Sequence, residues 1–121
     1  YARGNHETRG TFASFFQQYF SVKEPHLYFT MRQGPVFFIF LDTGEDKPDS
    51  DIAYCGITDY DRYRSEQAIW LEKVVNSDEF KQAPYKVVGG NKPPKTWERC
   101  HLAWSTGSSA KICPHFEQSW Y

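Results

Sequence analysis

Six consecutive apolar residues, Val36 to Leu41, constrain the fold of this chain more than any other segment. A run of this length is typical of a β-strand that is covered on both faces. The preceding segment, His26 to Arg32, alternates with period two, which indicates a half-buried strand. Between them, Gln33-Gly34-Pro35 has the composition of a turn. The sequence therefore predicts that the two strands pair as a β-hairpin.

Helices are predicted on both sides of this hairpin. Five aromatic residues at helical spacing between Phe12 and Phe20 indicate a helix that packs into the core, with Thr11 as its N-cap. A second amphipathic helix is expected from about Asp61 to Ser77. The short strand Tyr85 to Val88 follows it, and a strand–helix–strand unit implies a right-handed parallel crossover. The predicted fold class is α/β.

Charge and composition exclude several classes of protein. The 121 residues include 14 Lys and Arg against 15 Asp and Glu, so no basic excess is present to bind a nucleic acid backbone or an anionic lipid surface. The longest apolar run is too short to span a membrane. The chain begins with Tyr1 and shows no signal-peptide pattern, so we expect either a processed N-terminus or a piece of a longer protein. Three cysteines allow at most one disulfide, with Cys100–Cys113 favoured, and leave the redox compartment undetermined.

The string most typical of a catalytic loop is Gly4-Asn5-His6-Glu7, in a polar, turn-like segment. It resembles the third signature block of the calcineurin-like metallophosphoesterases, a superfamily that includes the purple acid phosphatases. Further strings resemble the purple-acid-phosphatase-like branch: Leu27-Tyr28-Phe29, Gly34-Pro35-Val36, Phe40-Leu41-Asp42-Thr43, Ser65-Glu66-Gln67 with Trp70-Leu71, and Tyr85 to Pro94. The resemblance covers residues 1–94.

This resemblance implies a fold and a chemistry. The fold would be part of a two-sheet β-sandwich with flanking helices. The activity would be metal-dependent hydrolysis of a phosphoric ester, in which two Mn, Fe or Zn ions about 3.5–4 Å apart bridge a hydroxide and clamp the phosphoryl oxygens.

The resemblance also assigns roles to individual residues. Asn5 would be a metal ligand through its side-chain oxygen, and His6 would contact the phosphate and assist the leaving group. Asn91 stands where the family has a ligand histidine. Glu7 would orient the loop or accept a hydrogen bond behind the ligands, and Arg9 would meet the phosphate.

Departures from the family pattern limit the expected activity. The D-x-H and G-D-x-x-D blocks that precede the Asn-His block in the family are absent, as is the closing G-H-x-H block. Asn91 replaces a stronger imidazole ligand. Because one ligand and one substituted position cannot hold two metals, we expect little or no phosphatase activity from this chain alone. The alternative is a non-catalytic remnant or binding module of the same fold. The resemblance favours an extracytoplasmic location.

The domain organisation expected from the sequence is a metallophosphoesterase-like fragment, 1–94, followed by a divergent tail, 95–121. Two explanations of the tail are open: a reading-frame change in the source gene, and a genuine divergent region. A zinc site built from Cys100, His101, Cys113 and His115 is disfavoured because the usual C-x₂₋₄-C pair is missing.

Three further features have plain structural interpretations. Asp42 is expected to cap the turn that follows the apolar run rather than to bind a metal. The acidic residues Glu45, Asp46, Asp49 and Asp51 do not have the spacing of an EF-hand and indicate a solvated loop. If the aromatic face between Phe12 and Phe20 lacks its partner, we expect it to drive self-association.

Overall fold

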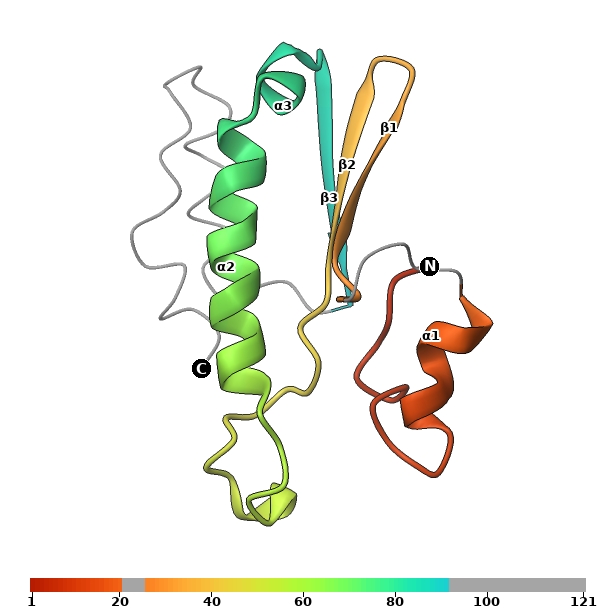
Figure 1. Ribbon diagram of the computed structural model, residues 1–121, viewed down its shortest axis with the longest axis vertical. Coiled ribbons are helices and arrows are strands. Elements are labelled where there is room, and N and C mark those ends of the chain that lie inside the picture. Colours follow the sequence, from red (N-terminus) through yellow and green to blue (C-terminus); the bar gives the residue numbers. More distant parts are fainter. Residues whose placement is uncertain (21–25, 92–121) are drawn as a thin grey trace. The chain divides into compact units, whose positions relative to one another are not determined.

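The computed structural model describes residues 1–20 and 26–91, which contain three α-helices and an open, three-stranded mixed sheet (Figure 1). The predicted α/β class is confirmed. The described residues fall into two compact units, one made of 1–20, 26–46 and 83–91, the other of 47–82. The expected tail, with the cysteine pair and the zinc alternative, lies outside the described residues.

The sheet belongs to the first unit. Its strands are β1 (Phe29–Gln33), β2 (Val36–Leu41) and β3 (Tyr85–Gly90), in the order β1-β2-β3. β1 is antiparallel to β2, and β3 is parallel to β2, so the predicted hairpin and the parallel pairing are both confirmed. Gly34 has a φ of +57° in the hairpin turn, a conformation that favours glycine.

The hydrophobic centre of this unit lies on one face of β2. Phe37, Ile39 and Leu41 point to that face and are at most 3% exposed. The alternate residues of β2 are only half-buried, so β2 is covered more completely on one face than on the other. The half-burial predicted for the preceding strand is wrong, because Thr30 to Gln33 are exposed on β1, an edge strand that pairs on one side only.

The aromatic segment forms less helix than predicted. A 3₁₀ turn at Ala13–Phe15 leads into α1, which is only Phe16–Tyr19. The predicted N-cap, Thr11, is wrong: the cap position is Phe12, without a side-chain hydrogen bond. Phe20 adopts an extended conformation and ends the helix. A segment this rich in aromatic residues has low helix propensity, and no capping side chain compensates for it.

The aromatic face is also less buried than predicted. Phe16 is 8% exposed, but Phe12 and Tyr19 are 70% and 72% exposed. The ring of Tyr1 stacks on Phe20 with centroids 4.1 Å apart. The prediction of a core helix is therefore correct for Phe16 and wrong for the most exposed rings.

The second unit contains α2 (Tyr60–Asn76), close to the predicted helix, and α3 (Asp78–Gln82). Ser77 separates them: its hydroxyl donates to the Val74 carbonyl at 2.7 Å and accepts from the Phe80 N–H at 3.3 Å. A 3₁₀ turn, Ile52–Tyr54, lies in the preceding loop. Over residues 1–20 and 26–91, no helix has the length and apolar character needed to cross a bilayer.

Candidate functional site

Two parallel strands end at the same edge of the sheet, and a polar residue follows each of them. Asp42 comes directly after β2, and Asn91 comes directly after β3. In open α/β sheets, ligands bind outside the carboxyl ends of the strands. The opening loop, residues 3–9, contacts this same edge. We call this set of contacts the strand-end site.

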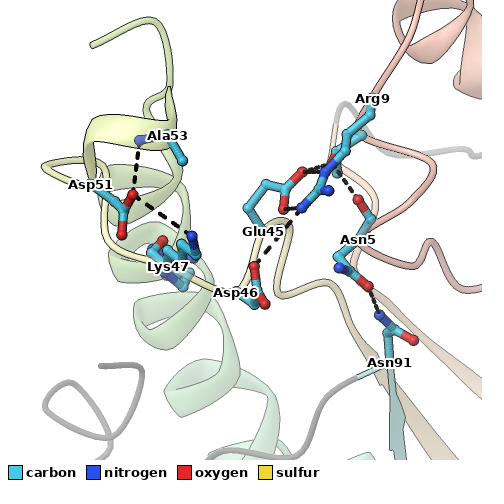
Figure 2. Close-up of polar contacts among 10 residues, drawn as sticks. Asn5, Arg9, Glu45, Asp46, Lys47, Asp51, Ala53 and Asn91 are labelled. Atoms are coloured by element: carbon cyan, nitrogen blue, oxygen red, sulfur yellow. Dashed lines mark hydrogen bonds and ion pairs between the residues drawn. The ribbon is translucent and has the colours of Figure 1, made fainter. Parts of the chain in front are cut away.

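Asn5 and Asn91 meet at this edge although they are 86 positions apart. The Asn91 Nδ2 donates to the Asn5 Oδ1 at 2.9 Å (Figure 2). Asn91 is exposed and Asn5 is half-buried, so the pair is accessible to solvent. The structure thus brings together the two residues that the family resemblance proposes as metal ligands. Asn91 presents its NH2 group, a donor, to the Asn5 oxygen, so the Asn91 amide would have to turn for both oxygens to face one cation.

Gly4 allows the loop to approach β3 closely. Its N–H donates to Glu7 Oε2 at 2.8 Å, which closes the turn around His6. A Cβ atom at position 4 would lie 2.6 Å from Glu7 Oε2 and 3.4 Å from the Asn91 side chain. A side chain at position 4 would therefore displace the Glu7 carboxylate, which holds the loop by accepting from the Gly4 backbone.

Glu45 anchors the second half of the loop. Its Oε1 accepts from Arg9 Nε and its Oε2 from Arg9 Nη2, both at 2.7 Å (Figure 2). The Thr8 hydroxyl also donates to Glu45 Oε1. Glu45 is 5% exposed, so the prediction of a solvated acidic loop is wrong for this residue. Arg9, predicted to meet phosphate, is held in this two-pronged ion pair, and Asp46 lies 4.0 Å from it.

Arg3 forms the second ion pair of the strand-end site, and sequence reasoning missed it. Arg3 Nη2 lies 2.7 Å from Asp42 Oδ2, and Asp42 is 1% exposed. Asp42 Oδ1 also accepts from the Gly44 N–H at 3.1 Å, which confirms the predicted turn cap. The only signal for the pair was an arginine directly before the Gly-Asn-His string, and no spacing rule connects it to a residue 39 positions away.

His6 is exposed at the turn. Within the described part of the chain its imidazole makes no ion pair or hydrogen bond, unlike the side chains of its neighbours Asn5 and Glu7. The ring is therefore accessible to a molecule that binds at this edge.

A dinuclear metal centre does not fit the described residues. Among residues 1–20 and 26–91, no three His, Cys, Asp or Glu side chains are grouped so as to hold a metal ion. The two asparagine amides are weak ligands for Mn, Fe or Zn, and the buried Asp42 is paired with Arg3. The donors present are fewer than such a centre requires.

In the second unit, the acidic residues serve as caps rather than as a calcium site. Asp49 accepts from the N–H groups of Tyr60 and Asp61 at 2.9 and 2.7 Å, at the start of α2. Asp51 accepts from the Ala53 N–H at 2.9 Å (Figure 2). Both residues are half-buried and keep contact with solvent, as expected of a solvated loop, but their carboxylates also cap backbone N–H groups.

The charge of Asp49 is stabilised by its partners. Burial raises the pKa of the Asp49 carboxyl, but hydrogen bonds from the backbone of Asp61 and Tyr60, with the charge of Arg64, lower it on balance. The carboxylate therefore stays ionised and caps the helix at neutral pH.

No protein-family model matches this chain, and neither the curated proteins nor the solved structures give a significant match. The metallophosphoesterase interpretation therefore depends on the residue strings described above and on the geometry of the strand-end site.

Proposed function

We propose that the strand-end site is part of the active site of a metal-dependent phosphoric ester hydrolase of the calcineurin-like metallophosphoesterase type, on a partial β-sandwich. The contact between Asn5 and Asn91 carries this proposal. The resemblance assigns metal ligation to these two positions and to no others among the described residues. Their convergence at the carboxyl ends of β2 and β3 is the arrangement that such a site needs.

The chain's own residues have distinct parts in this proposal. His6 is accessible and stabilises or protonates the leaving oxygen of a bound phosphate ester. Glu7 holds the turn that presents His6. Because Glu45 compensates the charge of Arg9, phosphate contact by Arg9 requires that this ion pair open or share its donors.

Because the described donors do not fit two metal ions, we expect the chain by itself to hydrolyse phosphate esters poorly or not at all. The ion pair between Arg3 and Asp42 favours a second candidate, a non-catalytic binding module of the same fold. Arg3 neutralises the buried carboxylate of Asp42 and Arg9 that of Glu45, so both buried carboxylates of the strand-end site are already paired with arginines.

A substitution that supplies a stronger ligand separates the two candidates. Asn91→His places an imidazole, a better ligand for Zn or Mn, next to Asn5. The matched control is Asn76→His, which adds the same group at an exposed position of α2. Zn²⁺ and Mn²⁺ affinities would be measured by calorimetry, and turnover with a chromogenic phosphate monoester and diester.

The hydrolase proposal predicts tighter metal binding by Asn91→His, by about tenfold or more, or about 1.4 kcal/mol. It also predicts metal-dependent turnover above that of the unaltered chain, and neither change in Asn76→His. If Asn91→His binds metal no better than the control, the proposal fails. Tighter binding without turnover would favour the non-catalytic module.

A further inference from the structure

The strand-end site contains two arginines, and both are compensated by buried carboxylates. Arg3 Nη2 lies 2.7 Å from Asp42 Oδ2, and Asp42 is 1% exposed. Arg9 Nη2 lies 2.7 Å from Glu45 Oε2, and Glu45 is 5% exposed (Figure 2). Each arginine therefore cancels the charge of its partner, and neither adds a net positive charge to the site.

An incoming anion cannot easily draw these arginines away from their partners. If Arg9 turned from Glu45 to a phosphate group, a buried carboxylate would lose its compensating charge, which is strongly destabilising. The same holds for Arg3 and Asp42, because Asp42 is buried still more deeply. The two ion pairs therefore persist when a ligand binds, and the ligand meets arginines whose charge is already neutralised.

Glu7 adds a negative charge that forms no ion pair within residues 1–20 and 26–91. Its carboxylate accepts the Gly4 N–H at 2.8 Å. A Cβ atom added to Gly4 would lie 2.6 Å from Glu7 Oε2 and 3.4 Å from the Asn91 side chain, so this carboxylate and the Asn91 amide are close neighbours. Glu7 also follows His6 directly in the sequence. The charge of Glu7 thus lies beside the residues that the proposed function assigns to ester binding.

We propose that the strand-end site favours phosphodiesters over phosphomonoesters. The inference deepens the proposed function and rests on it. A diester carries one negative charge, whereas a monoester carries close to two at neutral pH. Because the site combines neutralised arginines with the charge of Glu7, the second charge of a monoester meets repulsion there. A charge placed in this way selects against the more highly charged ligand.

The chain's own side chains make this selection. The described donors do not fit two metal ions, so the inference takes no charge from a metal and is tested in metal-free solution. His6 meets the phosphoryl oxygens of either ester, so its contribution to binding is common to both. The difference between the two ester classes therefore depends on the charge of Glu7.

Binding of dimethyl phosphate and of methyl phosphate to the full chain, in the presence of a chelator, tests the inference. At about pH 8 methyl phosphate carries two charges and dimethyl phosphate one. Binding is followed through the backbone amide resonances of residues 4–9. We expect dimethyl phosphate to bind about threefold more tightly, or better.

Two matched variants assign the preference to one charge. Glu7→Gln keeps an oxygen that can accept from the Gly4 N–H, and it should bring the ratio of the two affinities close to one. Glu72→Gln removes the same charge at an exposed position of α2 and should leave the ratio unchanged. The unaltered chain tests the preference by itself if Glu7→Gln fails to fold.

The outcomes separate this inference from the proposed function. If neither ester shifts the resonances of residues 4–9, the site binds no phosphate ester, and both the proposed function and the inference fail. If methyl phosphate binds there as tightly as dimethyl phosphate, only the preference for diesters is wrong. A ratio that is unchanged in Glu7→Gln, or that falls equally in Glu72→Gln, also overturns the inference, because the charge of Glu7 is then not its cause.

Discussion

Arg3 and Asp42 form an ion pair that fastens the opening loop to the end of β2, with Arg3 Nη2 2.7 Å from Asp42 Oδ2. Asp42 is almost fully buried and also caps the turn at Gly44. The Arg3 side chain is 14% exposed, so both charges are largely removed from water. Removing one member of such a pair leaves the other charge uncompensated.

Asp42→Asn is therefore expected to destabilise the protein. The amide retains a carbonyl oxygen for Gly44 but no longer compensates Arg3, at a cost of about 2–4 kcal/mol in the free energy of unfolding. Urea unfolding followed by circular dichroism measures the change. Asp59→Asn is the control, because it removes an exposed ion pair with Arg62 and should barely alter stability. If Asp42→Asn and Asp59→Asn lower the free energy of unfolding equally, the buried ion pair with Arg3 contributes no more than the exposed one.

Sequence patterns predicted the sheet better than they predicted the site. The apolar run Val36–Leu41 and the turn at Gly34 were sufficient for the hairpin, because period and turn chemistry are local properties. The prediction of a core helix in the aromatic segment was partly wrong for a related reason. Ring spacing indicates which residues share a helix face, but not whether other residues cover that face. Its short helix and exposed rings follow from weak propensity and a missing cap.

Glu45 is expected to restrain the Asn-His loop. Glu45→Gln keeps the size of the side chain but removes the charge that binds Arg9 and the acceptor geometry that binds Thr8. Amide hydrogen exchange at positions 5–9 should become at least several-fold faster, since breaking the anchor lowers the local opening free energy. Asp46→Asn is the control, because it also removes a carboxylate near Arg9, but one that lies 4.0 Å from it, whereas Glu45 lies 2.7 Å from it. Unchanged exchange in Glu45→Gln would mean that the loop is held by other contacts.

Gly4→Ala tests the close approach of the loop to β3. The added methyl group would lie 2.6 Å from Glu7 Oε2, so either the turn or the Glu7 side chain must move. We expect loss of the contact between Asn5 and Asn91, seen as a change in the side-chain amide resonances of both residues. Ala13→Ser is the control, because it makes a similarly small change elsewhere in the opening segment. If both amide resonances stay at their original shifts in Gly4→Ala, the turn does not control the pair.

Asp49 should make stability depend on acid pH. Its pKa is lower in the folded state than the ordinary value of 3.8, so its contribution is complete above that value and is lost as pH falls through the lower folded pKa. Urea unfolding between about pH 5 and pH 2 should show a shallower decline for Asp49→Asn than for the unaltered chain. Asp78→Asn, at the start of α3, is the control. An identical decline in Asp49→Asn would contradict the capping role.

The strand-end site shows why some of its residues could be proposed from the sequence and others could not. Gly4-Asn5-His6-Glu7 is a contiguous string, so it could be recognised without a structure. The partners of this loop, Asp42, Glu45 and Asn91, are distant in sequence and come together only because β2 and β3 are parallel neighbours. Asn91 was proposed through a family pattern, whereas Glu45 was assigned to a solvated loop because nothing local signals its burial.

The most direct test of the site is whether one cation reaches both asparagines. In a titration of the isotope-labelled chain with Mn²⁺, the paramagnetic ion broadens the side-chain amide resonances of residues that lie near it. The proposed function predicts that Asn5 and Asn91 broaden together, at lower Mn²⁺ concentration than Asn76 on α2. If Asn76 broadens at the same concentration, or only one of the pair responds, Asn5 and Asn91 do not form a cation site and the hydrolase proposal is contradicted.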